Sequence, residues 1–337
     1  MIELNNFYIS ESVDFMKKNI PDNFVDLTVT SPPYDKLRKY KGFAFDFKSI
    51  ANELFRITKN GGVVIWVVGD GTTKGSETGT SFKQALYFKE IGFNLHDTMI
   101  YKTDKMPLNH NRYEQEFEYM FVLSKGKPKT FNPIFVECTQ ANKKHSKATF
   151  RQDGDNLSSL HNLGTVKSHK IKGNIWYIVS GFQKTTKDKI AYKHPAVFPD
   201  KLAQDHILSW SNENDIIFDP MCGAGTTCKM AYLNNRKFIG IDISEEYINE
   251  ICIPRLKQYN LKGENMENNN IKVGDRFIID TNICDDIELL EWYYEQEDKI
   301  LVAKTIECDV NGIWVKSCDF RIDMNEIILK GDQNEKV

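Results

Sequence analysis

Short runs of β-branched and apolar residues alternate with amphipathic helical segments along most of the chain, and this alternation constrains the fold more than any other feature. The runs at 24–29 and 63–68 are typical of buried strands, and the segment 47–58 between them places Ile50 and Leu54 on one helical face. Strands that alternate with helices predict an α/β fold with a doubly wound, mostly parallel sheet. Such sheets bind ligands at the carboxyl ends of their strands. Further strands are expected at 6–9, 98–101, 119–123, 215–218 and 237–241, and further helices at 12–18, 81–90, 201–211 and 244–259.

The alternating pattern is interrupted in the middle of the chain. From 125 to 189 the apolar content is low, and we expect an irregular connection there. The apolar run 173–178 is the exception, and its Trp176 and Tyr177 are predicted to lie in the core. A connection this long inside an α/β domain is typically functional.

The carboxyl-terminal part follows a third pattern. A polar linker is expected at 263–270, and short alternating strands follow it. The pair Asn311-Gly312 between two such strands is a strong signal for a β-hairpin. The segment 271–337 is therefore predicted to form a small all-β module.

Charge is distributed unevenly, although the formal net charge is only −3. The segment 125–193 has fourteen Lys or Arg against four Asp or Glu, a net charge of +10, whereas 271–337 has eight against sixteen, a net charge of −8. A localised basic segment is consistent with a polyanionic partner. A solvated lysine-rich loop region has the same composition and stays open as an alternative.

Composition excludes several classes of protein. Hydrophobic residues make up 41% and charged residues 27%, as in soluble globular proteins, and the chain has neither an apolar run of membrane-spanning length nor a signal peptide at its start. The seven cysteines are scattered without a Cys-x-x-Cys pair. This spacing argues against a disulfide framework and a metal site, and it favours a reducing cytoplasm.

The expected strand at 24–29 is followed by Thr30-Ser31-Pro32-Pro33-Tyr34. Two consecutive prolines fix their φ angles and lack N–H groups, so the carbonyls around them point rigidly. The Ser31 hydroxyl and the Pro32 carbonyl can accept the two hydrogens of an exocyclic amino group, and Tyr34 can stack on the ring that carries it. A Pro-Pro turn that merely ends a strand is the alternative.

A second candidate site follows the expected strand at 215–218. There Gly223 and Gly225 precede a helix, and Asp242 ends the next strand. Glycines allow close approach of a ligand, and an acidic residue at that place suits ribose hydroxyls. A Walker lysine is absent from this loop, and Cys228 stands where a dinucleotide site prefers a small residue. S-adenosylmethionine is the nucleoside ligand that remains, with Asp219 facing its ammonium group.

Three motifs resemble, in type and order, those of the beta-class exocyclic-amino DNA methyltransferases. They are Thr-Ser-Pro-Pro-Tyr at 30–34, Phe-Asp-Pro-Met-Cys-Gly-Ala-Gly-Thr-Thr at 218–227 and Gly-Ile-Asp-Ile-Ser at 240–244. The segment 194–198 is similar to the family element upstream of the cofactor loop. The resemblance covers residues 7–259 and implies a Rossmann-like methyltransferase fold with permuted motif order. It departs from the family where Ile9-Ser10 replaces a common Gly-Asp. The implied divisions are a catalytic half at 1–130, a target-recognition insert at 131–193, a cofactor-binding half at 194–262 and the β module at 271–337.

The resemblance also implies roles for individual residues. The catalytic residues are Ser31, Pro32, Pro33 and Tyr34. The residues implied to bind S-adenosylmethionine are Ile9, Ser31, His194, Phe198, Asp219, Met221, Cys222, Gly223, Gly225, Thr226, Asp242 and Ile243. The candidate DNA-binding residues are Lys36, Arg38, Lys39, Lys143, Lys144, Arg151, Gln152 and Asn156.

The function implied is site-specific methylation of the exocyclic amine of a base flipped out of double-stranded DNA. No proline is followed by cysteine, which argues against methylation of cytosine at ring carbon 5. Serine at position 31 favours cytosine N(4), whereas the family's adenine enzymes usually have aspartate there, and adenine N(6) stays an alternative. A silent DNA-binding protein on the same scaffold and a methyltransferase for RNA or protein are further alternatives. A homodimer and a cognate restriction nuclease are left open, and the expected location is the cytoplasm of a bacterium, with a bacterial or phage gene.

Overall fold

The computed structural model contains two compact units, Met1–Lys257 and Gln258–Val337, each of which is described by itself. Strands and helices dominate the first unit, whereas the described part of the second consists of short strands that follow the end of a helix. The residues that the structure describes are 2–33, 45–103, 113–144, 147–151, 157–161, 165–266, 276–279, 301–302, 305–309, 312–317, 320–323 and 327–329.

The first unit is built on an eight-stranded sheet with the order β1-β14-β13-β2-β3-β7-β6-β12. Strand β7 runs antiparallel to both of its neighbours, and the other pairs are parallel. The prediction of a doubly wound, mostly parallel sheet is thus confirmed. The strands are β1 (Asn6–Ile9), β2 (Val25–Thr30), β3 (Thr58–Val68), β6 (Asn94–Lys102), β7 (Phe117–Ser124), β12 (Ile175–Tyr177), β13 (Ile216–Asp219) and β14 (Lys237–Asp242).

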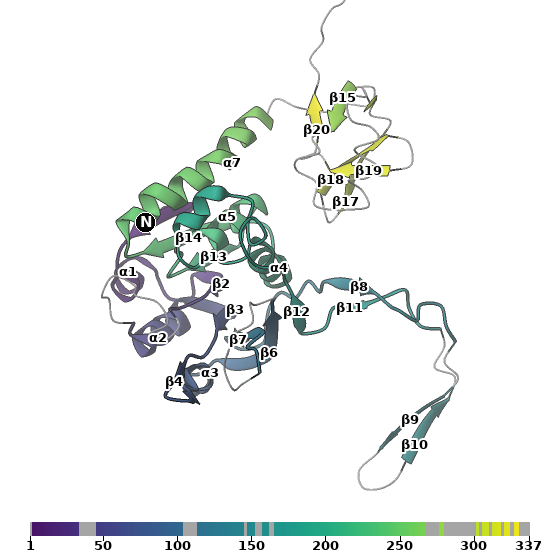
Figure 1. Cartoon of the computed structure of the whole chain (residues 1–337), viewed down its shortest axis with the longest axis horizontal. Coiled ribbons are helices and arrows are strands. Elements are labelled where there is room, and N and C mark those ends of the chain that lie inside the picture. The colour runs from purple at the N-terminus through teal and green to yellow at the C-terminus, as the bar shows by residue number, and fades with distance from the viewer. Residues whose placement is uncertain are drawn as a thin grey trace, which may run out of the picture. The chain divides into compact units, whose positions relative to one another are not determined.

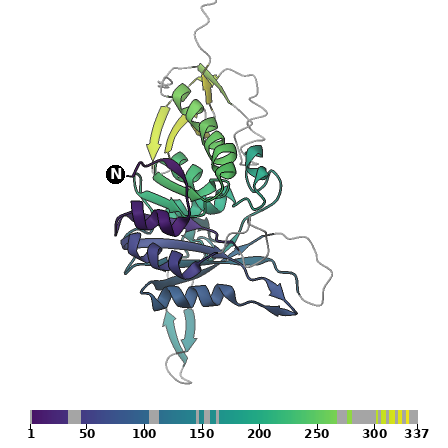
Figure 2. The same cartoon turned by 90° about the vertical axis from the view of Figure 1, so that its left-hand side faces the viewer.

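Helices cover both faces of this sheet (Figures 1 and 2). Successive residues of β3 face opposite sides, so that Val63 and Ile65 join one buried cluster while Val64 and Trp66 join the other. The second cluster includes α1 (Ser12–Asn19), α2 (Phe47–Ile57) and α3 (Thr80–Glu90). The first includes α4 (Asp200–Trp210), α5 (Thr226–Leu233) and the helical run α6 (Glu245–Tyr247), a π turn (Ile248–Cys252) and α7 (Ile253–Met266).

Two predicted element ends differ from the structure. Helix α2 stops at Ile57, and the residues Asn60-Gly61-Gly62, whose types usually end a helix, lie inside strand β3. There Gly61 has a φ of +82°, and its N–H donates to Lys125 O at 2.6 Å. Helix α7 continues to Met266, so it includes the first part of the predicted linker. Strand pairing at the first place and continuation of the helix at the second outweigh the local preference of these residues for a turn.

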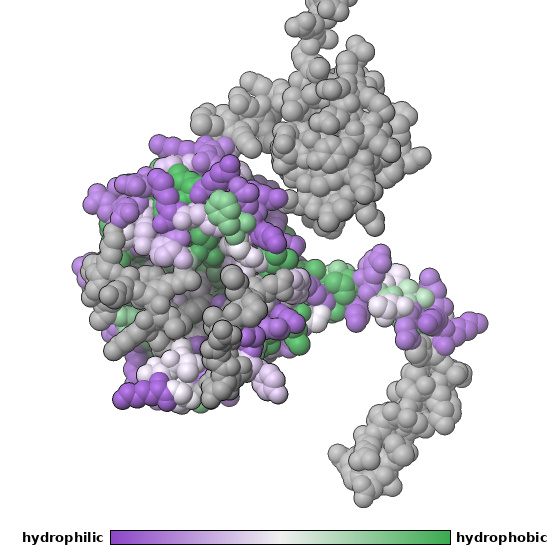
Figure 3. Space-filling model, in the orientation of Figure 1, coloured by the Kyte–Doolittle hydropathy of each residue, from purple (hydrophilic) through white to green (hydrophobic). Residues whose placement is uncertain are grey.

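The prediction that 125–189 is irregular is wrong. Strand β8 (Phe135–Glu137) pairs antiparallel with β11 (His169–Ile171), and β9 (Lys147–Arg151) pairs antiparallel with β10 (Leu157–His161). We call 135–171 the ribbon; Figure 3 shows apolar residues gathered where it leaves the sheet. All three residues of β11 are exposed, and β8 has only the half-buried Val136 between two exposed residues, so neither strand has the buried face of a strand on a core.

The ribbon returns to the sheet through β12, which pairs with β6 at the sheet edge. Trp176 is buried as predicted, but Tyr177 is 53% exposed, so its predicted place in the core is wrong. Adjacent residues of a strand face opposite sides, and only one side of β12 packs on the core. A short hairpin, β4 (Thr72–Thr73) with β5 (Ser76–Glu77), follows β3.

The described residues of the second unit form two three-stranded antiparallel sheets. The predicted hairpin is present, with Asp309 opposite Gly312. Across all described residues, no helix has the length and apolar character needed to span a membrane. The strands are β15 (Arg276–Ile279), β16 (Leu301–Val302), β17 (Thr305–Asp309), β18 (Gly312–Ser317), β19 (Phe320–Asp323) and β20 (Ile327–Leu329).

Candidate functional site

The carboxyl ends of β2 and β13 lie side by side because these strands pair in parallel. The Thr30 hydroxyl donates to Asp219 Oδ1 at 2.7 Å, across 189 positions of sequence. The Thr227 hydroxyl donates to the Val29 carbonyl at 3.0 Å. Both bonds are buried, so they fix the loop after β2 against the loop after β13.

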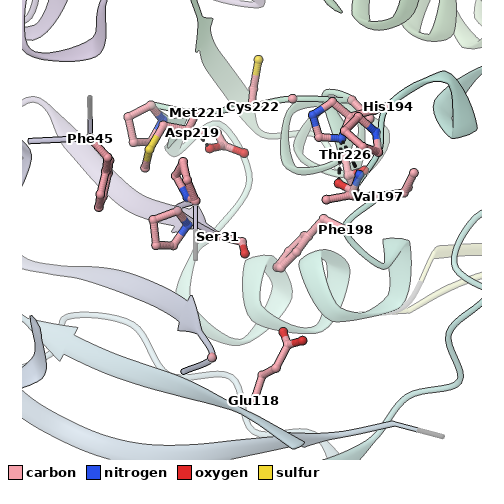
Figure 4. A pocket seen from close by; sticks show the side chains of 18 of the residues that line it. Ser31, Phe45, Glu118, His194, Val197, Phe198, Asp219, Met221, Cys222 and Thr226 are labelled. Atoms are coloured by element: carbon pink, nitrogen blue, oxygen red, sulfur yellow. Dashed lines mark hydrogen bonds between the residues drawn. The ribbon is translucent and has the colours of Figure 1, made fainter. Parts of the chain in front are cut away.

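These two loops line one cavity of about 2410 Å³. Ser31, Pro32 and Pro33 come from the first loop, and Gly223 comes from the second. In Figure 4 the side chains of Ser31 and Asp219 lie on one side of this space and His194 and Phe198 on the other. The cavity therefore brings together the two motifs that the sequence places far apart.

Asp219 is a buried carboxyl group at the strand end. Burial raises its pKa to about 7, and the negative charge of Asp242 acts in the same direction, while hydrogen bonds from Thr30 and the Met221 N–H oppose the shift. Its charge thus changes near neutral pH. A cation in the cavity would favour the ionised form.

The loop from Gly223 to Thr226, here called the glycine loop, has a backbone that excludes side chains at two places. Gly223 has a φ of +50°, and a Cβ there would lie 2.9 Å from His194 Nε2. Gly225 has a φ of +73°, and a Cβ there would lie 3.1 Å from Cys252 Sγ. Glycine is required at both for this conformation.

Asp242 closes the glycine loop from the neighbouring strand. Its Oδ2 accepts the Gly223 N–H at 2.9 Å, and its Oδ1 accepts the Ser244 N–H at 2.9 Å. Burial raises the pKa of this carboxyl group, and the backbone donors lower it. Ser244 also caps the following helix, because its hydroxyl accepts the Tyr247 N–H.

The opposite wall comes from the segment before α4. A 3-10 helix (Lys189–Lys193) ends at His194, whose ring packs edge-on against Tyr247 with 4.5 Å between ring centroids. His194 Nδ1 lies 2.8 Å from the Ala196 carbonyl oxygen, which fixes the ring orientation. Phe198 lines the cavity from the same segment. The wall is apolar apart from the imidazole.

Comparison with known proteins decides the family. A family model described as DNA methylase matches residues 25–252, which includes both loops of the cavity. The chain belongs to this DNA methylase family. The orphan methyltransferase M.BamHII of Bacillus amyloliquefaciens is 58% identical over 256 residues, 75% of this chain and 96% of that protein. The type II methyltransferase M.BglII of Bacillus subtilis is 29% identical over 279 residues, 79% of this chain and 71% of that protein.

The fold agrees with that of a solved relative. The structure of the cytosine-N4-specific PvuII DNA methyltransferase superposes with a TM-score of 0.53 at 20% identity, over 76% of this chain and 91% of that chain. The family match and the 58% identical methyltransferase show that the chain is an S-adenosylmethionine-dependent DNA methyltransferase, and the predicted enzyme class, cofactor and DNA substrate are confirmed. The tight glycine loop and the buried carboxyl groups beside it suit a small cationic nucleoside of this kind.

Most residues that the methyltransferase resemblance implied at the site do line the cavity. Ile9 and Gly225 are the exceptions among the described ones, because they do not line the cavity. Ile9 is 48% exposed and pairs with Asp242 in the sheet register, and Gly225 packs against Cys252 behind the loop. The residues that line it are Ser31, Pro32, Pro33, His194, Phe198, Asp219, Met221, Cys222, Gly223, Thr226, Asp242 and Ile243.

The predicted DNA contacts stay predictions, and the structure shows only where some of these residues lie. Lys143 and Lys144 are exposed next to the bridge between Lys144 and Thr165 in the ribbon, and Arg151 ends strand β9. The predicted residues that lie outside the described part of the chain are Tyr34, Lys36, Arg38, Lys39, Gln152 and Asn156.

Sequence reasoning missed several cavity residues of this methylase. Asp70 follows β3, and its carboxylate accepts the Ser81 N–H at 3.0 Å at the start of α3. Its place after a strand is a signal that could have identified it. Glu118 and Tyr101 line the cavity from within β7 and β6, where sequence position gives no such signal. Cys222 and Cys228 are both buried.

Proposed function

We propose that the chain is a site-specific methyltransferase that modifies the exocyclic amine of a base flipped out of double-stranded DNA, with cytosine N(4) as the favoured target. One observation supports this most strongly. Ser31 and Pro32, the expected amine acceptors, line the same cavity as Gly223 of the glycine loop. A donor site and an acceptor site in one cavity are what direct transfer needs.

The cofactor is proposed to lie along the glycine loop. Asp242 would bind ribose hydroxyls with its remaining lone pairs, Phe198 and His194 would border the nucleoside, and ionised Asp219 would face the ammonium group. The cofactor supplies a methyl group on a positively charged sulfur. Met221, Cys222, Thr226 and Ile243 complete the proposed contacts.

The residues of the loop after β2 are proposed to activate the amine. An exocyclic amine is a poor nucleophile because its lone pair is delocalised into the ring. Ser31 Oγ and the Pro32 carbonyl accept its two hydrogens and hold them out of the ring plane, which localises the lone pair. That pair forms the new N–C bond, the electrons of the old C–S bond stay on sulfur, and one amine proton leaves to solvent. Preorganised acceptors and positioning supply most of the rate.

Delivery of the base is the remaining requirement. A base inside a duplex cannot reach a cavity of this kind, so it must be extruded, at a cost of a few kcal/mol. Stacking on Tyr34, which lies outside the described residues, would offset about 1–3 kcal/mol of that cost. The exposed Lys143 and Lys144 and the ribbon's Arg151 are proposed to contact DNA.

The choice of base rests on the residue at position 31. Serine supports cytosine N(4), and the alternative is adenine N(6), because the two amines need nearly the same hydrogen bonds. Incubation with labelled S-adenosylmethionine and mixed-sequence DNA, followed by nucleoside digestion, tests the proposal. N(4)-methylcytosine is the expected product, and N(6)-methyladenine would refute the choice of base. A homodimer and a partner nuclease stay predictions.

A further inference from the structure

Behind the glycine loop, four charged side chains form a closed ring of alternating sign. Asp188 accepts from Lys229 Nζ at 2.9 Å and from Arg255 Nε at 2.6 Å. Asp200 accepts from Arg255 Nη2 at 2.8 Å and from Lys229 Nζ. The side chains of Arg255, Lys229 and Asp188 are 1%, 4% and 6% exposed. Asp200 is 23% exposed, so the two positive and two negative charges balance one another in a ring that is buried on three of its four members.

Arg255 uses all five of its N–H donors. Nε and one Nη2 hydrogen go to the two aspartates, and the other Nη2 hydrogen goes to the Thr186 hydroxyl at 3.0 Å. Nη1 donates to the Ala224 carbonyl and to the Thr226 hydroxyl, both at 2.9 Å. A guanidinium has five donors in a rigid fork, so this arrangement leaves it no freedom.

The Nη1 contacts reach the glycine loop itself. Ala224 lies between two glycines of positive φ, so the loop's own side chains do little to fix its backbone. The carbonyl of Gly223 receives the Cys252 thiol at 3.1 Å, and the carbonyl of Ala224 receives Arg255. Cys252 is the last residue of the π turn, and Arg255 lies three residues later in the first turn of α7, on the same face of the helical run. One helix thus holds two successive loop carbonyls from behind.

The aspartates of the ring bracket the opposite wall of the cavity. Asp188 comes six positions before His194, and Asp200 comes two positions after Phe198. The ring therefore fastens both ends of the segment that carries these two residues. Arg255 is bonded at once to the glycine loop and to this segment. Arg255 links the two walls directly, and Lys229 of α5 links the same two aspartates to the helix that follows the loop.

We propose that Arg255 is a positioning residue for the S-adenosylmethionine site, holding the glycine loop at a fixed distance from the His194–Phe198 wall. This rests on the proposed place of the cofactor between those walls. Desolvation of buried charges largely offsets their attraction, so such a ring adds little net stability. Its contribution is geometric, and Arg255 itself does not touch the cofactor.

The test compares Arg255→Lys with a matched control, Arg236→Lys. Arg236 is also buried, and it donates to Ser211 O at 2.8 Å and to Asn234 O at 2.6 Å. These three residues are not among the described residues that line the cavity. Lysine keeps the positive charge at each site but lacks the planar guanidinium group and its five N–H donors. Both variants should lower the melting temperature.

Only Arg255→Lys should weaken the cofactor site. Its calorimetric Kd for S-adenosylmethionine should rise about tenfold to a hundredfold, since bonds to a charged group are lost. The Kd for a DNA duplex should stay within about twofold, as should kcat at saturating cofactor, because the amine acceptors are untouched. A wild-type cofactor Kd in Arg255→Lys, or an equal loss in Arg236→Lys, would overturn the inference.

If Arg255→Lys does not fold, a second variant tests the same proposal. Asp188→Asn removes one charge of the ring at a residue that is not among the described residues lining the cavity, and it should also raise the cofactor Kd, by a smaller factor. An unchanged cofactor Kd in Asp188→Asn would contradict the proposed role of the ring. Cofactor binding is measured without DNA, so the result is separate from the proposed transfer reaction. Wild-type protein that binds cofactor without methylating an amine would refute the proposed function and leave this inference standing.

Discussion

The cavity and the ribbon place polar residues in opposite surroundings. Asp219 at the cavity and Arg255 behind the glycine loop are both buried, and partners from distant parts of the chain satisfy them. On the ribbon, Lys143 and Lys144 are exposed, and described contacts there are mostly between paired strands. We propose that chemistry which needs fixed distances lies on the sheet, whereas contact with DNA is made by the exposed ribbon. Substitutions should therefore separate cleanly: cavity changes should affect turnover and cofactor binding, and ribbon changes should affect DNA affinity.

The largest effect is expected at the amine acceptor. Ser31→Ala removes one of the two acceptors, and kcat should fall about a hundredfold or more. The cofactor Kd should change little, because the hydroxyl is assigned to the base. Single-turnover methylation and calorimetry measure the two quantities. Unchanged turnover would show that the Ser31 hydroxyl has no role in transfer.

The next effect is expected at the glycine loop. Gly223→Ala puts a methyl group 2.9 Å from His194 Nε2 at a positive φ, and the cofactor Kd should rise about tenfold. Gly75→Ala is the control: its φ is +78°, but a Cβ there meets no described atom within 4 Å. Both carry the backbone strain, and only the first should lose cofactor. Equal binding by the two variants would contradict the close fit.

A pH dependence of similar size is expected from Asp219. Its pKa in the folded protein is raised from 3.8 to about 7, so at pH 6 the carboxyl group must first lose a proton to face a cation. The cofactor Kd should be about tenfold higher at pH 6 than well above pH 7. Asp219→Asn should flatten this dependence, and a wild-type pH profile in that variant would exclude the assigned contact.

The raised pKa of Asp219 affects stability in the opposite direction: as the pH rises, cofactor binding should improve, but the protein without ligand should become less stable. The folded state holds the Asp219 proton more tightly than the unfolded chain, so this contribution is complete below about pH 4 and is lost as the pH rises to about 7. Denaturant unfolding of wild type and Asp219→Asn across this range measures it. A difference that grows in favour of wild type toward pH 7 would contradict the burial argument.

The smallest effect is expected on the ribbon. The double change Lys143→Ala and Lys144→Ala should weaken DNA binding by less than about tenfold and reduce the salt dependence by about two ions. Turnover at saturating DNA should be unchanged. Lys18→Ala, on the exposed surface of α1, is the control. A loss of turnover without a loss of affinity would break the separation between the two regions.

Much of the site was predictable because its residues follow strands directly. Ser31–Pro33 and Gly223 interrupt strong apolar runs with residue types that have few structural uses. The ring around Arg255 was not predictable, since its bond to Asp188 joins residues 67 positions apart and no local pattern marks either one. The direction of β7 was also beyond the sequence pattern, because the periodicity of a buried strand is the same in both orientations. The strands β8 and β11 escaped prediction because they have no buried face.

The pairing of β2 with β13 has a consequence for synthesis of the chain. On the ribosome, Val25–Thr30 emerges early, but its neighbour Ile216–Asp219 is made nearly two hundred residues later. Until then the apolar strand presents an open edge, which is a ready template for unwanted association. Nascent chains should depend on chaperone protection for this interval, and slow translation of the insert would lengthen it.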